Sequence, residues 1–389
     1  MKIILTGGGS GGHITPLLAV AHELKVLEPN CQIIYIGQRG DDFNSTMSDN
    51  SNIDACYTIR AGKFRRYHVH KIRQLFDLPT IAKNIRDLWR VTIGLWESWR
   101  LLRKLKPEVI FIKGAFVGVP VGLAAAWLHI PFVTHDSDVT PGLANRIIAR
   151  WASAHAVALP RSSYTKYQAS NTYTVGVPVT SDYQYITTVN QNQLRESLGL
   201  SKYKQMIFVT GGGLGADSMN ISVANASVDL LKKYPQLVVV HAAGRKNERS
   251  LSQLYNSLLS TDERKRIIVK DFLHDLYLYS GAADLIITRA GATSMAEFAI
   301  QGKACILIPN PHLTAGHQTK NAKLLAKQGA VKVISEDDLK KSKFLETVVI
   351  DLLESETARY NLGDSLHKLA HPTAAAELSQ LILTVSKKT

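Results

Sequence analysis

The fold of this chain is decided near its start by the stretch Lys2-Ile3-Ile4-Leu5-Thr6-Gly7-Gly8-Gly9-Ser10-Gly11-Gly12-His13, which joins an apolar run to a glycine-rich turn. The same pattern returns as Met206-Ile207-Phe208-Val209-Thr210-Gly211-Gly212-Gly213-Leu214-Gly215. Glycines at such turns let backbone amides approach an anion, and the N-terminus of the following helix adds partial positive charge. One glycine loop at the head of each half predicts two similar α/β domains that face a shared ligand.

Short apolar runs alternate with helical patterns along the chain. The predicted strands are Ile3–Leu5, Gln32–Ile36, Val109–Lys113, Phe132–His135, Ala154–Ala158, Tyr173–Val175, Met206–Thr210, Leu237–Ala242, Ile267–Lys270, Leu285–Thr288, Cys305–Ile308 and Val331–Ile334. The predicted helices include Pro16–Leu27, Thr80–Leu105, Gly142–Ala152, Ser218–Lys233, Ser294–Gln301 and Thr319–Gln328. Apolar strands alternating with helices indicate parallel sheets buried on both faces. We therefore predict an α/β fold of two doubly wound, Rossmann-like domains with a central cleft, where ligands bind at the carboxyl ends of the strands.

A polar stretch with little periodicity, Thr180–Gln193, separates the two runs of strands. We place the domain boundary there, giving an N-terminal domain of residues 1–179 and a C-terminal domain of residues 180–366. The last helical stretch, Ala374–Val385, lies within residues 367–389, which we expect to pack back on the first domain.

Composition limits the class of protein. The chain has 389 residues, of which 45% are hydrophobic and 20% charged, and this suits a globular protein with two full cores. Three scattered cysteines, Cys31, Cys56 and Cys305, predict reduced structural thiols. The longest apolar stretch, Val117–Val133, is interrupted by glycine, proline and histidine, so we expect a soluble or peripheral protein. Met1 runs straight into a predicted strand, so we expect no signal peptide.

Positive charge gathers in one region. The formal net charge is +14, and residues 60–106 hold 13 Lys and Arg against 3 Asp and Glu, together with three of the five tryptophans. Basic groups beside aromatic residues suit an anionic membrane surface. The expected contacts are Arg65, Arg66, Lys71, Arg73, Trp89, Trp96 and Trp99. A solvated basic face is the alternative, and no nucleic-acid motif supports nucleic acid as a partner.

The first glycine loop contains the spacing G-x-G-x-x-G at Gly7, Gly9 and Gly12. A dinucleotide site would also need an acidic residue near the end of the second strand. That strand runs out at Gly37-Gln38, which are not acidic, so the requirement for a dinucleotide site is not met. His13 is a different signature, since it places an imidazole at a helix N-terminus. The helix end lowers the pKa of the ring and favours a neutral base. A histidine that merely caps the turn is the alternative.

The second informative block runs from Thr288 to Glu297. Gly291 makes a turn after a strand, and Thr293 and Ser294 start a helix whose amides and hydroxyls suit a diphosphate. The Glu297 carboxylate, about one turn further, can accept hydrogen bonds from both hydroxyls of a ribose. Thr293 or Ser294 with Glu297 also fits a capping box, which is the structural alternative.

Two further polar blocks follow predicted strands. Gln318 and Asn321 are three residues apart and share a helix face, where their amides could reach sugar hydroxyls, and a surface helix start is the alternative. Asp136 and Asp138 could orient an acceptor hydroxyl or form the carboxylate pair of a hydrolase. Asp-Ser-Asp before Pro141-Gly142 is also ordinary turn chemistry.

Together these motifs resemble the MurG family of bacterial peptidoglycan glycosyltransferases over essentially the whole chain. The resemblance is carried by Gly7–His13, Gly62–Tyr67, Lys113–Val117, His135–Asn145, Gly211–Gly215, Arg289–Glu297 and Gly316–Asn321. It implies a GT-B fold and an inverting transfer of N-acetylglucosamine (GlcNAc) from UDP-GlcNAc to the 4-hydroxyl of the N-acetylmuramic acid (MurNAc) sugar of lipid I, giving lipid II on the cytoplasmic face of the cell membrane. No cofactor or metal is implied.

The resemblance also implies residue roles. His13 is the leading hypothesis for the general base and Asp136 the second, with Ser10, Gly11, Gly12 and Asp138 on the acceptor side. Contacts to the donor are expected from Gly213, Leu273, Ala292, Thr293, Ser294, Met295, Ala296, Glu297, Gln318 and Asn321. Glu297 would hold the ribose, the backbone of Leu273 the uracil, and Gln318 and Asn321 the GlcNAc. Amides and helix dipoles at 211–215 and 292–294 would stabilise the leaving UDP.

Several positions depart from the family pattern, and two rival functions remain. Gly213 replaces a usual serine, Ser10 a threonine, Asp136 a glutamate and Ala115 a glycine, while Thr180 stands where some relatives place an arginine. One rival is another GT-B glycosyltransferase that acts on a glycolipid, such as a diacylglycerol glycosyltransferase. The other is a non-hydrolysing UDP-GlcNAc epimerase, which needs no aromatic basic patch.

Overall fold

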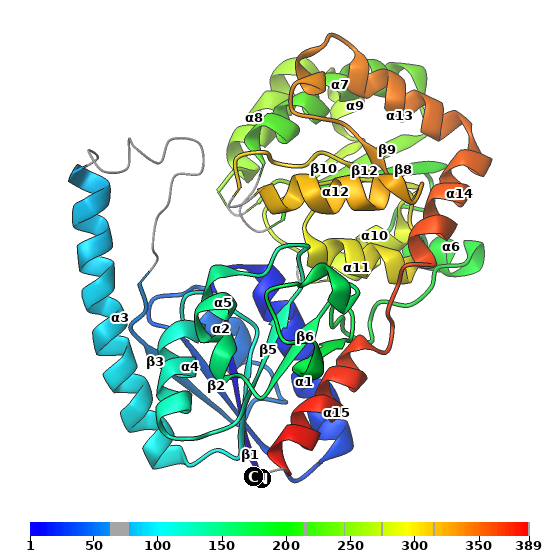
Figure 1. The fold of residues 1–389 in the computed structure, drawn as a ribbon. Helices are drawn as coiled ribbons and strands as arrows, with labels where there is room; N and C mark the ends of the chain where they lie inside the picture. Colours follow the sequence, from blue (N-terminus) through cyan, green and yellow to red (C-terminus); the bar gives the residue numbers. More distant parts are fainter. Residues whose placement is uncertain (63–77, 213–215, 245, 274, 314–315, 388–389) are drawn as a thin grey trace. The chain divides into compact units, whose positions relative to one another are not determined.

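The computed structural model describes residues 1–62, 78–212, 216–244, 246–273, 275–313 and 316–387. The chain divides into two compact units: the first comprises Met1–Thr180 and His371–Thr389, and the second comprises Ser181–Ala370 (Figure 1). The second unit is therefore an insertion between two segments of the first.

The first unit is built on a seven-stranded parallel sheet in the order β3-β2-β1-β4-β5-β6-β7. The strands are β1 (Lys2–Thr6), β2 (Gln32–Gln38), β3 (Ala55–Ile59), β4 (Val109–Ile112), β5 (Phe132–Asp136), β6 (Ala154–Val157) and β7 (Thr172–Thr174). Its helices are α1 (Gly11–Leu27), α2 (Phe43–Ser48), α3 (Leu78–Leu105), α4 (Gly118–Trp127), α5 (Leu143–Ile148) and α15 (Ala374–Ser386).

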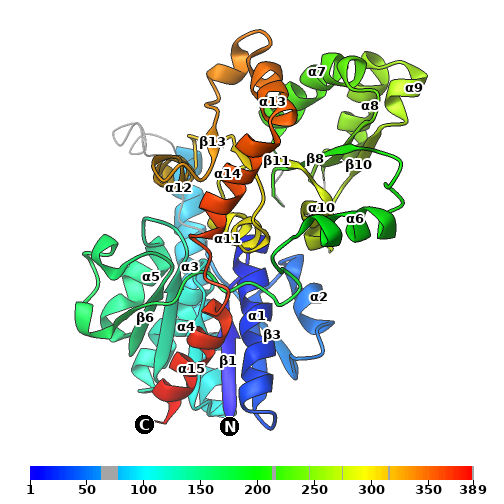
Figure 2. The ribbon, with the colours of Figure 1, turned by 90° about the vertical axis from the view of Figure 1, so that its right-hand side faces the viewer.

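The strands of this sheet are apolar on both faces because helices cover both. Ile3 and Leu5 of β1 pack into one core with α1 and α15, whereas Ile4 packs into a second core with α3, α4 and α5. The C-terminal helix α15 lies against α1, and the Ser379 hydroxyl donates to the Val20 carbonyl over 3.4 Å (Figure 2). The last helix is thus part of the first core.

The second unit is built on a six-stranded parallel sheet in the order β10-β9-β8-β11-β12-β13. The strands are β8 (Gln205–Thr210), β9 (Leu237–Ala242), β10 (Ile267–Lys270), β11 (Leu285–Thr288), β12 (Cys305–Leu307) and β13 (Lys332–Val333). Its helices are α6 (Thr188–Ser197), α7 (Asp217–Lys233), α8 (Glu248–Leu258), α9 (Thr261–Arg264), α10 (Leu276–Ala282), α11 (Ala292–Gln301), α12 (His317–Lys327), α13 (Phe344–Glu354) and α14 (Glu356–His367). This arrangement confirms the predicted α/β class with two doubly wound parallel sheets.

The strand orders define one switch point in each sheet. β1 pairs with both β2 and β4, and β8 pairs with both β9 and β11, so the chain leaves the middle strand of each sheet toward opposite sides. Loops at the carboxyl ends of such strands diverge and leave a crevice for a ligand. The loops after β1 and β4, and those after β8 and β11, are therefore the positions where each unit can bind one.

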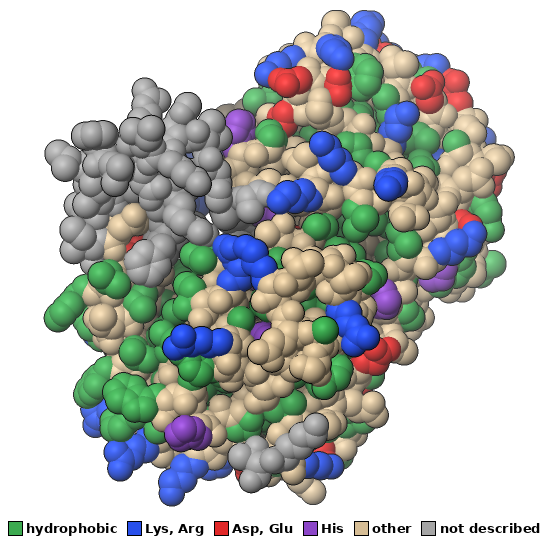
Figure 3. Space-filling model, viewed as in Figure 1, with side chains coloured by type: hydrophobic (Ala, Val, Ile, Leu, Met, Phe, Trp, Pro, Cys, Tyr) green, Lys and Arg blue, Asp and Glu red, His purple; other side chains and the backbone are tan. Residues whose placement is uncertain are grey.

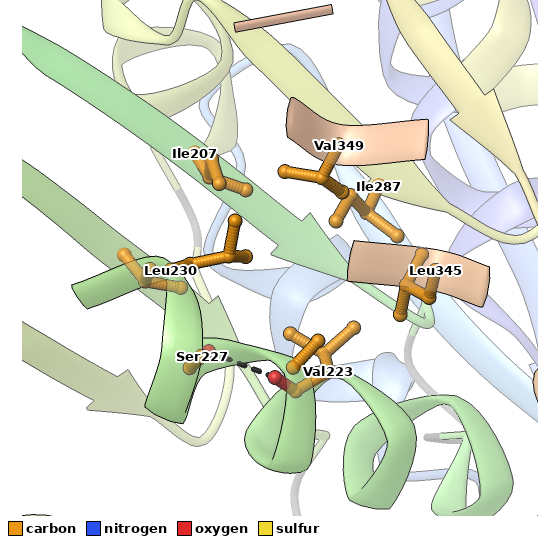
Figure 4. Close-up of a pocket in the computed structure, with 9 residues that line it drawn as sticks. Ile207, Val223, Ser227, Leu230, Ile287, Leu345 and Val349 are labelled. Carbon is orange, nitrogen blue, oxygen red and sulfur yellow. Dashed lines mark hydrogen bonds between the residues drawn. The ribbon is translucent and has the colours of Figure 1, made fainter. Parts of the chain in front are cut away.

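A small cavity of about 10 Å³ lies in the core of the second unit, lined by Ile207, Val223, Ala226, Ser227, Leu230, Val239, Ile287, Leu345 and Val349 (Figure 4). Its walls are apolar, and the Ser227 hydroxyl is turned to the Val223 carbonyl at 2.8 Å. The predicted site residues contribute none of this lining. The cavity is a packing defect of the core between β8, α7 and α13.

Some predicted boundaries were wrong. Helix α1 begins at Gly11 instead of Pro16, so the proline lies inside the helix and removes one intrahelical hydrogen bond. Strand β3 and helix α4 were missed, and α6 occupies part of the polar stretch 180–193. Among the described residues, no helix is long and apolar enough to cross a membrane.

Candidate active site

The first glycine loop joins β1 to α1 at the switch point of the first sheet. Gly9 has a φ of 78°, which favours glycine, and Ser10 is extended before the helix begins. The amides of His13 and Ile14 bond to the Ser10 carbonyl over 3.0 and 3.3 Å. His13 is therefore the third residue of α1, and its side chain is half-buried.

The His13 ring lies beside the loop that follows β4, across the switch point. A Cβ atom at Gly114, whose φ is 116°, would lie 3.5 Å from His13 Cε1 and 3.7 Å from the Asn145 side-chain amide. A side chain at Gly114 would be strained by its backbone and crowd the ring. The loops after β1 and β4 and the helix α5 thus bring His13, Gly114 and Asn145 together.

Asp136 ends β5 with its carboxyl group buried. One oxygen accepts a hydrogen bond from the Gly142 amide at 2.8 Å, and the other accepts from the Tyr167 hydroxyl at 2.5 Å. Burial raises the pKa of Asp136, while the hydrogen bonds from Tyr167 and Gly142 oppose the rise. This arrangement fixes the 137–142 turn. Asp138 is half-buried, and its backbone carbonyl accepts from Tyr164 Oη at 3.0 Å.

Lys113, which we did not select from the sequence as a site residue, directly follows β4 and lies next to the first glycine loop. Its buried ammonium donates to Ser137 Oγ at 2.8 Å, and burial lowers its pKa to about 8 against the opposing influence of Asp136 and Asp138. His135 is also buried, with Nε2 2.8 Å from the Gly176 carbonyl, and burial with the Lys113 charge holds its pKa well below the usual value. The sequence could have identified Lys113 as a site residue, because it is a lysine directly after the apolar run Val109–Ile112.

The second glycine loop joins β8 to α7 at the switch point of the second sheet. Gly212 has a φ of 74°, and its amide donates to Thr210 Oγ1 at 3.4 Å. Gly213, one of the predicted donor contacts, lies outside the described residues. Buried Arg289 follows β11 and bonds to the Ile308 carbonyl, to Ser218 Oγ and to Glu336. This buried ion pair, also missed from the sequence, holds together the ends of three loops.

Helix α11 starts at the same switch point and has Gly291 as its N-cap. The capping-box alternative for Glu297 is therefore wrong, because Thr293 and Ser294 lie inside the first turn and Gly291 has no capping side chain. The predicted donor contacts Ala292, Ser294 and Ala296 are half-buried, and Thr293 and Met295 are buried. The helix N-terminus adds partial positive charge here.

Glu297 is buried one turn further along α11 and is hydrogen-bonded to Tyr183. Burial raises the pKa of Glu297 to about 8, and the bond from Tyr183 opposes that rise. Burial and the Glu297 charge in turn raise the pKa of Tyr183 well above its usual value. Tyr183 was not predicted, because it lies in the polar stretch that we assigned to the domain boundary.

Helix α12 carries the predicted residues Gln318 and Asn321. The side-chain oxygen of Gln318 accepts from the Asn310 amide at 2.9 Å, and Asn321 donates to the Ala290 carbonyl, just before α11, at 3.3 Å. Leu273 lies half-buried after β10 and packs against a core cluster of the second unit. The structure thus brings 292–297 and Asn321 together at one strand edge. Within the described part of the chain, no three His, Cys, Asp or Glu side chains are grouped to hold a metal ion.

Comparisons with known proteins agree for both units. Residues 3–157 match the glycosyltransferase family 28 N-terminal domain, and residues 206–378 match the glycosyltransferase family 28 C-terminal domain. A curated protein of Natranaerobius thermophilus, a UDP-N-acetylglucosamine--N-acetylmuramyl-(pentapeptide) pyrophosphoryl-undecaprenol N-acetylglucosamine transferase, is 30% identical over 98% of this chain and 99% of its own length.

Two solved structures show the shared fold. The crystal structure of Acinetobacter baumannii MurG has a TM-score of 0.67 and 24% identity, covering 98% of this chain and 99% of its own. A UDP-GlcNAc 2-epimerase of Neisseria meningitidis, solved with UDP-GlcNAc, has a TM-score of 0.63 and 15% identity, covering all of both chains. These similarities confirm the predicted GT-B fold. At such low identity they do not distinguish a transferase from an epimerase.

Proposed function

We propose that the chain, which belongs to glycosyltransferase family 28, transfers N-acetylglucosamine from UDP-GlcNAc to the 4-hydroxyl of the N-acetylmuramyl sugar of an undecaprenol-linked pyrophosphate. The main support for UDP-GlcNAc as the donor comes from the segment Gly291–Glu297, at the switch point of the second sheet. There a helix N-terminus with no capping side chain is followed, one turn on, by a buried carboxyl group. A helix N-terminus suits a diphosphate, and a carboxyl group one turn further suits the hydroxyls of the adjacent ribose.

In the proposed reaction, His13 takes the proton from the acceptor hydroxyl as its oxygen attacks C1 of GlcNAc. The new glycosidic bond forms from the face opposite UDP, the bond from C1 to the phosphate oxygen breaks, and UDP leaves with the electron pair. The configuration at C1 is thereby inverted. Negative charge on UDP is stabilised by the amides at the start of α11 and after β8.

Asp136 has a different proposed role. Both of its oxygens accept hydrogen bonds from within the chain, which favours a function in holding the 137–142 turn that carries Asp138. His13 is half-buried at a helix N-terminus and adjoins the Gly114 backbone, which favours His13 as the base.

The lipid-linked acceptor makes a membrane surface the natural place for this enzyme, and helix α3 supports that proposal. Trp89 and Trp96 are 68% and 55% exposed, and Arg100 lies over the Trp96 ring. Trp99 contacts Trp127 on α4 at a ring distance of 6.5 Å and carries Arg103 over its face. Hydrophobic side chains follow the edge formed by α3 in Figure 3, with basic ones near its carboxyl end.

Aromatic rings with arginine side chains lying over them suit the interface of an anionic bilayer. We therefore propose peripheral docking of α3 on the cytoplasmic face of the cell membrane. The predicted contacts Arg65, Arg66, Lys71 and Arg73 lie outside the described residues.

The decisive experiment incubates the protein with UDP-GlcNAc and a soluble analogue of the lipid-linked acceptor, and follows UDP release. Release that requires the acceptor supports the transferase. Conversion of UDP-GlcNAc to its C2 epimer without any acceptor would instead support the epimerase.

A further inference from the structure

The first glycine loop already binds a carboxylate from its own chain. The Gly9 amide donates to Asp41 Oδ2 at 2.6 Å, and the other carboxylate oxygen accepts from the Phe43 amide at 3.2 Å. The Asp41 backbone is tied down as well, because its amide donates to the Gln38 carbonyl at 3.2 Å and its carbonyl accepts from Asn44 at 3.1 Å. The carboxylate is therefore held between the loop after β1 and the turn after β2.

Gly8 and Tyr35 surround the bound carboxylate, and the missing side chain of Gly8 leaves space for it. A Cβ atom at Gly8 would lie 2.7 Å from Asp41 Oδ2 and 3.5 Å from Tyr35 Oη, so a side chain there would displace the carboxylate. Tyr35 is fully buried and donates to the Gly7 carbonyl at 2.7 Å. Burial, and then the Asp41 charge, raises the pKa of Tyr35. The contact between Asp41 and the Gly9 amide therefore depends on the absence of a side chain at Gly8.

We propose that Asp41 is a specificity-determining residue, which occupies the Gly9 amide of the first glycine loop and excludes diphosphate groups from that amide. An amide N–H bound to a carboxylate is not available to a second anion. A phosphate brought within a few ångströms would also be repelled by the Asp41 charge. This part of the loop is left to an uncharged group, such as a sugar hydroxyl beside His13.

The consequence for substrates rests on the proposed function, in which both donor and acceptor carry a diphosphate. With Asp41 in place, neither diphosphate is held on the Gly9 amide. The loop that presents His13 then accepts the sugar hydroxyl without competition from UDP, while the donor diphosphate is left to the N-terminus of α11.

Binding of inorganic pyrophosphate to the full-length protein tests this, with the amide resonance of Gly9 as the reporter. We compare the parent protein with Asp41→Ala and Asp41→Asn. Asp42→Asn is the matched control, because it removes one exposed carboxylate from the same turn without touching Gly9. Circular dichroism and thermal melting establish that each variant is folded. The assay needs neither donor nor acceptor, so its result is independent of the transferase activity.

Asp41→Ala should bind pyrophosphate at least about tenfold more tightly than the parent, with a saturable shift of the Gly9 resonance. Asp41→Asn should shift in the same direction and Asp42→Asn should behave as the parent. Equal affinity in the parent and both Asp41 variants, including no binding in any of them, would overturn the proposal. So would a saturable Gly9 shift in the parent itself.

Discussion

The Tyr167 hydroxyl donates a 2.5 Å hydrogen bond to the Asp136 carboxylate, and both groups are buried in the first unit. Tyr167 also stacks on His155 at a ring distance of 4.1 Å, so the donor is held rigidly against the end of β5. The second carboxylate oxygen accepts a hydrogen bond from the Gly142 amide. Asp136 thereby connects the end of β5 to the start of α5.

Tyr167→Phe should lower the free energy of unfolding by about 1–3 kcal/mol, because a buried carboxylate loses one of its donors. Asp136→Asn should destabilise by a similar amount, since its amide cannot accept from both Tyr167 and Gly142 in the native geometry. Chemical denaturation measures both, and Tyr173→Phe, on an exposed ring, is the control. Full loss of turnover in Asp136→Asn at unchanged stability would favour Asp136 as the base instead.

His13→Ala should reduce kcat by about 10²–10⁴-fold at saturating donor and acceptor, because a general base contributes roughly that factor. His22→Ala is a matched control, since His22 is exposed on the same helix. UDP release measured with the acceptor analogue gives the rates. Turnover near that of the parent in His13→Ala would show that another group takes the proton.

Glu297→Ala should raise the dissociation constant of UDP-GlcNAc by about tenfold or more, because the hydrogen bonds between the carboxyl group and the two ribose hydroxyls, each worth about 1 kcal/mol, would be lost. Calorimetric titration with UDP-GlcNAc measures the constant, and the exposed Glu356→Ala serves as the control. An unchanged donor affinity would contradict the ribose role.

The raised pKa of Glu297 makes stability dependent on pH. The carboxyl group ionises near 4.5 in the unfolded chain and near 8 in the folded one. Between these pH values the folded state holds a proton that the unfolded state has lost, so the free energy of unfolding falls as the pH rises. The slope is at most about 1.4 kcal/mol per pH unit. Glu297→Gln should therefore gain stability over the parent from pH 5 to pH 8.

Thermal melts of Glu297→Gln and the parent across this pH range give the difference directly. Glu356→Gln, on an exposed side chain, should track the parent at every pH. A difference that stays constant from pH 5 to pH 8 would mean that Glu297 is not protonated in the folded state.

Trp89→Ala and Trp96→Ala should weaken binding to vesicles that contain anionic phospholipid, because each exposed ring would lose its place in the interface. Higher salt should weaken binding of the parent, since it screens the basic groups around these rings. Vesicle co-sedimentation measures both effects, with Tyr360→Ala, an exposed ring in the second unit, as the control. Equal binding to neutral and anionic vesicles at all salt concentrations would rule out the electrostatic contribution.

Most of the fold could be predicted because buried parallel strands have a strong apolar signal. Leu237–Ala242 and Leu285–Thr288 were predicted with the bounds that the structure has. β3 was missed because Ala55–Tyr57 are only half-buried at the sheet edge and give no continuous apolar run. α4 was missed because Gly118, Pro120 and Gly122 interrupt its sequence, although Pro120 lies in the first turn, where its missing N–H is tolerated.

The positions of the candidate site residues followed from the same pattern, since glycine turns after apolar strands lie at the carboxyl edge of a sheet. Their partners did not follow. Tyr183 bonds to Glu297 and Asp41 bonds to Gly9, and each pair joins residues far apart in the sequence. Such pairings depend on loop conformations that local periodicity does not encode, so hydrogen-bond partners had to come from the structure.

The position of α15 determines the order in which the chain can mature during synthesis. Leu378, Ile382 and Val385 complete the core around β1 and α1, yet they leave the ribosome after every residue of the inserted unit. The second unit is continuous in sequence, so it can fold as soon as it emerges, whereas the first must wait for the final helix. The N-terminal unit is therefore begun first and finished last, and a chain that lacks α15 would have only one completed core.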